Sequence, residues 1–140
     1  MGDFEEGMKY WRDAGHVARR TLEAMKDELQ PGKTWHEIIE AAERFIHRHG
    51  GKPAFPGTIA VNNIAAHFTT EHTVTPPEGW EGDMVLQKGD LVKIDYGVHI
   101  KGHIGDNALT YEVGNTNNHT EQIKAAREAR DAAVEMMHPG

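Results

Sequence analysis

Apolar residues in the first part of the chain recur at alternating steps of three and four, the spacing of one helix face. This stripe comprises Met8, Trp11, Ala18, Leu22, Met25 and Leu29, with Gly15 in the remaining position, and Pro31-Gly32 follows it. A second stripe, formed by Trp35, Ile38, Ile39, Ala42, Phe45 and Ile46, follows the capping-box pattern Thr34-Trp-His-Glu37 and is closed by His49-Gly50-Gly51. The pattern predicts two long amphipathic helices that pack on a sheet.

The pattern then changes to that of strands. Residues 52–57 are rich in proline and glycine and predict a break, and residues 58–61 predict a short strand. A polar connection covers residues 68–89, with its one apolar stretch at residues 84–86. Residues 91–100 and 103–113 predict a hairpin around Lys101-Gly102, and residues 121–137 predict a final amphipathic helix.

The final helix repeats part of the first one. Ala18, Arg19, Ala24, Pro31 and Gly32 match Ala126, Arg127, Ala132, Pro139 and Gly140 at a constant offset of 108 residues. We therefore predict that residues 1–140 form a single αβ domain, in which residues 1–113 are one repeat unit and residues 114–140 are the loop and opening helix of a second.

Composition narrows the class of protein. An apolar fraction of 38%, a charged fraction of 26% and the lack of any long apolar run indicate a soluble globular chain. The net charge of −7 argues against binding of nucleic acid. The chain has no cysteine, so thiolate metal sites and disulfides are excluded, and its acidic start lacks the features of a secretory signal. We expect a cytoplasmic protein with no membrane partner.

Two aspartates stand out because they lie inside the predicted hairpin, although aspartate is disfavoured in strands. If Lys101-Gly102 is a two-residue turn, Asp95 lies opposite Ala108. Asp95 and Asp106 then share one face of the sheet as diagonal neighbours, roughly 7–8 Å apart at Cα. A three-residue loop would instead place them on opposite faces.

Two converging carboxylates allow three interpretations: they hold a divalent metal, share a proton as a general acid–base pair, or are simply solvated. The metal interpretation leads because their repulsion requires a counter-charge, and Lys93 is the cation nearby on the same face. Oxygen ligands, with histidine as a possible addition, suit Mn, Fe, Co or Zn.

Two further residues have alternative roles. His67, in a short apolar stretch, is either a buried hydrogen-bonded histidine or an imidazole that shuttles a proton or binds substrate beside a metal. Phe55, between Pro53 and Pro56, is either a core anchor or the wall of a pocket. From the residues alone, the structural role is favoured for both.

The combination of segments 55–67, 88–99 and 102–110 resembles the type 2 methionine aminopeptidases of archaea and eukaryotes. The step of twelve residues from Phe55 to His67 and that of eleven from Asp95 to Asp106 both fit this family. The resemblance implies an α+β fold, namely the first half of a pita-bread fold: an antiparallel sheet covered by two long helices, plus a terminal helix equivalent to the start of the second half.

The resemblance also implies roles. Asp95 would chelate one metal ion and Asp106 would bridge two ions, which could be Co, Mn, Fe or Zn. His67 would be a catalytic and substrate-binding residue near the metal, and Phe55 would line the pocket for an N-terminal methionine. The implied activity is hydrolytic removal of that methionine from peptides and nascent chains.

The resemblance covers only the first half of such an enzyme, because the ligands that the second half supplies have no counterpart here. We therefore expect a protein that is inactive or weakly active unless a homodimer or a complementing second half completes the site. The alternatives are a non-catalytic binding or dimerisation module on the same fold, and a pita-bread hydrolase of other specificity, such as a proline peptidase or a creatinase.

Overall fold

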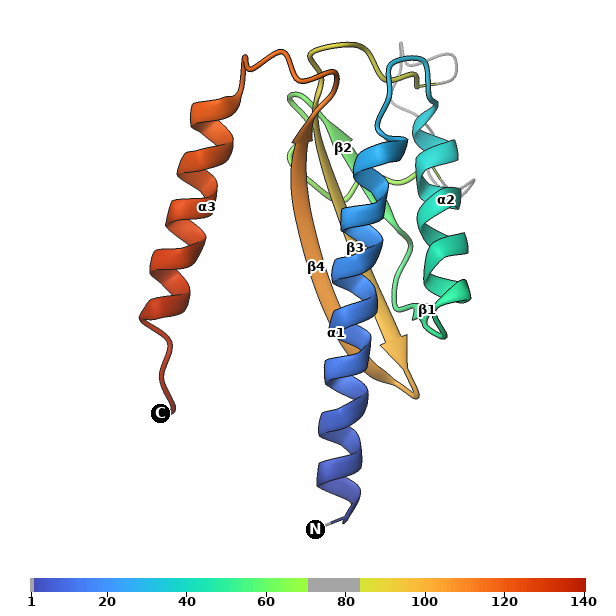
Figure 1. Ribbon diagram of the computed structural model, residues 1–140, viewed down its shortest axis with the longest axis vertical. Helices are drawn as coiled ribbons and strands as arrows, with labels where there is room; N and C mark the ends of the chain where they lie inside the picture. Colours follow the sequence, from blue (N-terminus) through green and yellow to red (C-terminus); the bar gives the residue numbers. More distant parts are fainter. Residues whose placement is uncertain (1, 71–83) are drawn as a thin grey trace.

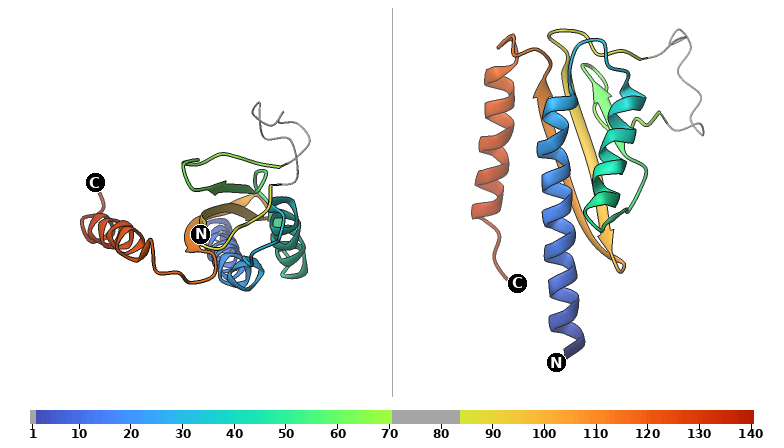
Figure 2. Two further views of the ribbon diagram at one scale, coloured as in Figure 1. Left: turned by 90° about the horizontal axis from the view of Figure 1, so that it is seen from above. Right: turned by 45° about the vertical axis from the view of Figure 1, so that its right-hand side comes forward.

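A computed structural model describes residues 2–70 and 84–140 and shows three helices and a sheet of four strands (Figure 1). The helices are α1 (Gly2–Glu28), α2 (Trp35–Arg48) and α3 (Thr120–Glu135), and the strands are β1 (Lys52–Pro53), β2 (Thr58–Val61), β3 (Leu91–Ile100) and β4 (His103–Glu112). Seen from above, α1 and α2 lie on one side of the sheet, whereas the loop after β2 lies on the other (Figure 2). We call this second side the open face.

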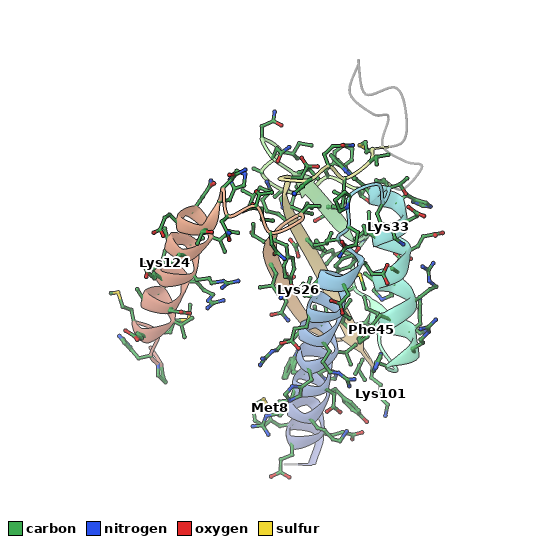
Figure 3. All side chains as sticks on the ribbon, turned by 45° about the horizontal axis from the view of Figure 1, so that its top comes forward. Met8, Lys26, Lys33, Phe45, Lys101 and Lys124 are labelled. Atoms are coloured by element: carbon green, nitrogen blue, oxygen red, sulfur yellow. The ribbon has the colours of Figure 1, made fainter. Side chains whose placement is uncertain are left out.

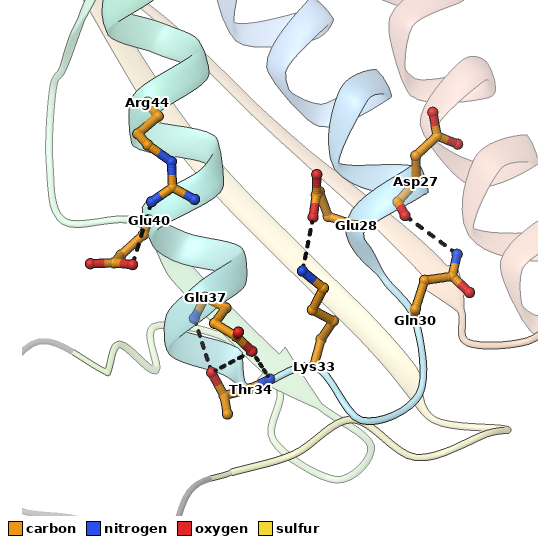
Figure 4. A network of polar contacts seen from close by, with 8 residues as sticks. All are labelled: Asp27, Glu28, Gln30, Lys33, Thr34, Glu37, Glu40 and Arg44. Atoms are coloured by element: carbon orange, nitrogen blue, oxygen red, sulfur yellow. Dashed lines mark hydrogen bonds and ion pairs between the residues drawn. The ribbon is translucent and has the colours of Figure 1, made fainter.

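The turn between α1 and α2 is fixed by the capping box that the sequence predicts. The hydroxyl of Thr34 accepts a hydrogen bond from the N–H of Glu37 (3.1 Å), and the carboxylate of Glu37 accepts one from the N–H of Thr34 (2.8 Å; Figure 4). The same view shows the ion pair between Lys33 and Glu28 (3.4 Å). The two hydrogen bonds of the capping box satisfy N–H groups that the first turn of a helix leaves without intrahelical partners.

The hairpin has the predicted register. Ile100 pairs with His103, Asp95 with Ala108 and Gly97 with Asp106. Both turn residues, Lys101 and Gly102, have positive φ values (50° and 84°), as a tight hairpin turn requires. β1 and β2 follow one another along the other edge of β3, so β4 forms an edge of the sheet as far as the structure describes it.

The core lies between the two helices and the sheet. Alternate residues of β3 point into this core and are fully buried, namely Val92, Ile94, Tyr96 and Val98. From α1 and α2 the core takes most of the two predicted stripes, including Leu22, Met25, Ile38 and Ile46. Helix α1 passes so close to β4 that a Cβ on Gly105 would lie 2.4 Å from the backbone nitrogen of Gly15.

Within the helices and the sheet, the structure differs from the sequence-based expectation at Trp11, at residues 52–53 and at Phe45. Trp11, predicted for the buried stripe, is 47% exposed and packs edge-on against His103, because the first turns of α1 extend past the sheet. Residues 52–53, predicted as part of a break, pair with β3 as the short strand β1. Phe45 is only half-buried and stacks on His49.

Helix α3 is set apart from the rest of the described chain. It begins at Thr120, close to the predicted start, yet none of its residues is buried (Figures 1 and 3). Glu112 anchors the loop before it. Hydrogen bonds from the hydroxyl of Thr116 and from the N–H groups of His119 and Asn118 hold the pKa of Glu112 below its usual range.

Much of the predicted connection 68–89 cannot be compared, because residues 71–83 lie outside the described residues. At its far end Leu86 is buried and Val85 forms a bridge with Thr34. In the described residues, no helix is long and apolar enough to cross a membrane.

Candidate metal centre

The register of the hairpin places the two aspartates on the open face. Asp95 and Gly97 point to the same side of β3, and Gly97 is paired with Asp106. Helices α1 and α2 cover the opposite side, where the alternating residues of β3 are buried. The predicted diagonal pair is therefore present, with both carboxylates facing away from the core.

Asp95 lies in an environment that disfavours its charge. Burial is the largest cause of its raised pKa, and the neighbouring carboxylate of Asp106 raises it further. The charge of His67 acts in the opposite direction. One oxygen, Oδ1, is buried and has no hydrogen-bond partner among the described residues. A buried carboxylate oxygen without a donor beside a second carboxylate is a favourable position for a cation.

His67 belongs to the loop after β2. Its backbone has a positive φ of 63°, which is uncommon for a residue other than glycine, and its side chain is exposed. The prediction of a buried histidine is therefore wrong. The charge of His67 lowers the pKa of Asp95, and the preceding residues Ala65 and Ala66 line a groove together with Asp95.

Phe55 also lies on the open face. A Cβ on Gly97 would be 2.2 Å from Cε1 of Phe55, so the phenyl ring lies directly on the glycine that is paired with Asp106. The ring is half-buried and is not a member of the core cluster. The prediction of a core anchor is wrong, and the ring of Phe55 instead lies over Gly97 on the open face.

The ammonium of Lys93 bonds to the backbone rather than to the carboxylate pair. It lies two residues before Asp95 on the same face, but its Nζ donates a hydrogen bond to the backbone carbonyl of Asn62 (2.7 Å). Burial lowers the pKa of Lys93. The described residues show no ion pair between Lys93 and either Asp95 or Asp106, and the ammonium of Lys93 bonds to the start of the loop after β2 instead.

These residues fit part of the ligand set of a divalent cation. Asp95 and Asp106 offer carboxylate oxygens, which suit hard and borderline cations. Within residues 2–70 and 84–140, no group of three or more His, Cys, Asp or Glu side chains could hold a metal ion. The pair therefore supplies two ligands and leaves the others to be provided from elsewhere.

A groove of about 370 Å³ lies beside the pair, between the open face and α3. The small side chains of Ala60, Ala65, Ala66 and Ala108 line this space, and Asp95 lines it as well. Lys93, Arg127 and Arg130 also line it. The groove thus gives access to Asp95 from the side of α3.

Comparison with known proteins supports a metal-dependent role. The model of metallopeptidase family M24 matches residues 9–140. The methionine aminopeptidase of Thermococcus kodakarensis is 40% identical over 128 residues, which make up 91% of this chain and 40% of that protein. The methionine aminopeptidase of Archaeoglobus fulgidus is 36% identical over the same share of each chain. The chain thus spans about two fifths of the length of these curated relatives.

Solved structures confirm the fold. A methionine aminopeptidase from Thermotoga maritima superposes with a TM-score of 0.80 at 26% identity, covering 96% of this chain and 54% of that one. A prolidase from Pyrococcus horikoshii gives a TM-score of 0.78 at 30% identity, covering 97% and 37%. The predicted α+β half of a pita-bread fold, with two helices over an antiparallel sheet, is confirmed.

Proposed function

Because the chain belongs to metallopeptidase family M24, we propose that it takes part in the metal-dependent removal of N-terminal methionine from peptides and nascent proteins. The observation that carries this proposal is the pair of carboxylates on the open face, one of which has a buried oxygen without a hydrogen-bond partner in the described part of the chain. The similarity to methionine aminopeptidases at up to 40% identity supports the choice of substrate.

In this proposal Asp95 and Asp106 hold the metal ions. When bound, a divalent metal such as Co, Mn, Fe or Zn would supply a Lewis acid and an acidified water. Two ions would occupy the complete site, and Asp95 and Asp106 would both supply carboxylate ligands to them. Their mutual repulsion and the burial of Asp95 disfavour the negative charge of Asp95, and a bound cation would relieve both.

His67 and Phe55 would act on the substrate. The exposed imidazole of His67, whose charge acts on Asp95, would contact the amide that is cleaved and move a proton there. The phenyl ring of Phe55, which lies on Gly97 beside the pair, would contact the methionine side chain. Both roles require a substrate bound over the open face.

The ligands missing from the site would come from a second copy of this chain or from a complementing second half. A symmetric homodimer would bring two carboxylate pairs together and complete each site with the partner's residues. Sedimentation with and without Mn²⁺ tests this arrangement. A species that stays monomeric in both conditions contradicts the homodimer.

Titration with Mn²⁺, compared between the wild type and Asp106→Ala, tests the metal centre. We expect binding that is weak, because two carboxylates are few ligands, and that is lost in the variant. Asp131→Ala, which removes an exposed carboxylate on α3, is the control and should bind as the wild type does. Binding that persists in Asp106→Ala would favour a non-catalytic module on this fold.

Cleavage assays decide the specificity. A solved prolidase structure has a similar fold and 30% sequence identity to this chain, so a proline peptidase is the second candidate. With the site completed and Mn²⁺ present, we expect Met-Ala-Ser to be cleaved and an Xaa-Pro peptide to be left intact. The opposite preference would replace methionine removal by proline peptidase activity.

A further inference from the structure

Next to the carboxylate pair, a set of hydrogen bonds holds the start of the loop that carries His67. All four polar groups of Asn62 take part. Its N–H donates to the carbonyl of Leu91 (2.9 Å), and its Oδ1 accepts from the N–H of Leu91 (2.9 Å). Its Nδ2 donates to Oδ1 of Asp90 (2.9 Å), and its carbonyl accepts from Nζ of Lys93 (2.7 Å). We call these four residues the Asn62 clamp.

The clamp holds a backbone that does not form readily by itself. Asn62 and His67, at the two ends of the loop, both have positive φ values, 52° and 63°. Such conformations cost free energy in residues other than glycine and persist when the surroundings enforce them. At the far end, the N–H of Ile59 donates to the carbonyl of Phe68 (2.8 Å). The loop is thus fixed to β3 at its start and to β2 at its end.

Lys93 is the member of the clamp that links the loop to the metal centre. It shares the open face with Asp95, two residues further along β3, and it lines the same groove. Its ammonium nevertheless bonds to the carbonyl of Asn62. A hydrogen bond from a charged, half-buried donor is stronger than one between neutral groups, so this contact can hold the loop in place.

We infer that Lys93 is a positioning residue: by holding the carbonyl of Asn62, it sets the loop after β2 so that the imidazole of His67 stays beside Asp95. This inference rests on the proposed function for the role of His67 in the reaction. The alternative role for Lys93 is that of a counter-charge to the carboxylate pair, and the two roles predict opposite results when the ammonium is removed.

The test uses nuclear magnetic resonance of the full chain with Mn²⁺ alone as the probe. Bound Mn²⁺ broadens the ring signals of a histidine that lies close to it. The variants are Lys93→Met, which removes the donor, and Lys93→Arg, which retains one. Lys52→Met, at an exposed lysine on β1, is the matched control.

In the wild type, Lys93→Arg and Lys52→Met, we expect Mn²⁺ to broaden the ring signals of His67. In Lys93→Met this broadening should be lost, while the affinity for Mn²⁺ at the Asp95–Asp106 pair stays within about twofold of the wild type, since the ligands are unchanged. If Lys93→Met binds Mn²⁺ more tightly and broadens His67 as the wild type does, Lys93 is a counter-charge and the inference is overturned.

Amide exchange in the metal-free protein separates a failure of the inference from a failure of the proposed function. If the wild type shows no Mn²⁺ binding that depends on Asp106, the proposed metal centre is wrong. The positioning role is then decided by the amides of Ile59 and Ile64, which hydrogen-bond within this loop and β2. Faster exchange of these two amides in Lys93→Met, with the β3–β4 amides unchanged, supports positioning; unchanged exchange overturns it.

Discussion

At the scale of single residues, the charge of Asp95 has a cost that a bound cation would remove. Burial and the neighbouring carboxylate of Asp106 raise the pKa of Asp95 above that of the unfolded chain. At any pH between the pKa of Asp95 in the unfolded chain and its raised pKa in the folded protein, the folded protein therefore binds more protons than the unfolded one. The contribution of Asp95 to the free energy of unfolding is therefore largest below the ordinary range of an aspartic acid, and it falls as the pH rises through the raised pKa of Asp95.

Asp95→Asn should remove this dependence in the metal-free protein. At neutral pH we expect the variant to be more stable than the wild type by up to roughly 1 kcal/mol, the size of a like-charge cross-strand pair in water. Urea unfolding at several pH values measures this. Asp27→Asn, at an exposed aspartate of α1, is the control and should keep the pH dependence of the wild type. If the free energy of unfolding of Asp95→Asn changes with pH as it does in the wild type, the prediction is contradicted.

The residues of the candidate site differ in how well the sequence predicts them. Alternation along strands and a two-residue turn are local rules, so the shared face of Asp95 and Asp106 follows from the sequence. The position of His67 does not follow in this way, because its loop is held by residues about thirty positions further along the chain. The position of Phe55 could have been inferred from Gly97, because a glycine in the strand leaves space above it for the phenyl ring.

At the scale of elements, α1 and β4 meet where two glycines face each other. A Cβ on Gly105 would lie 2.4 Å from the backbone nitrogen of Gly15, and backbone atoms cannot move aside as side chains can. A Cβ on Gly15 itself meets nothing within 4 Å. The two glycines at one contact therefore serve different purposes: Gly105 permits close packing, whereas Gly15 is only a weak point of the helix.

Gly105→Ala should lower the free energy of unfolding by about 1–3 kcal/mol, as overpacking does, or by more if α1 is displaced. Gly15→Ala should raise it by about 0.5–1 kcal/mol, because alanine favours a helix interior. Chemical denaturation of both variants measures the difference. If Gly105→Ala were as stable as Gly15→Ala, the close approach of α1 to β4 would be wrong.

The elements themselves were largely predictable, and the exceptions have physical causes. The capping box at Thr34 and the stripe of α2 are local signals, and both are present in the structure. The exposure of Trp11 could not be derived, because it depends on where the sheet ends beneath α1 rather than on the periodicity of the helix. Strand β1 has two residues, too few to show any alternation.

At the scale of the whole molecule, α3 lacks the packing that stabilises the other helices. Isolated helices of about this length are only marginally stable in water, and most helical stability comes from a buried face. None of the residues of α3 is buried, and Val134, Met136 and Met137 at its end are exposed. The five identities at an offset of 108 residues match this helix with α1, whose apolar side is covered by the sheet.

In monomeric protein we therefore expect the amides of α3 to exchange with solvent far faster than those of residues 14–28 in α1. Hydrogen–deuterium exchange followed by mass spectrometry measures both helices in one sample. Conditions that complete the site should slow the exchange of α3 and leave α1 as it was. Protection of α3 equal to that of α1 in a monomer would contradict its isolation.

The outer edge of β4 has a consequence for the behaviour of the protein at high concentration. This strand has ten residues without proline, and its outer N–H and C=O groups face no other strand among the described residues. Such an edge serves as a template on which further chains can add strands. Whatever covers β4 in the cell therefore also protects the chain from aggregation, and Ile104 on this strand, which is 53% exposed, is where a charged substitution would keep purified protein from precipitating.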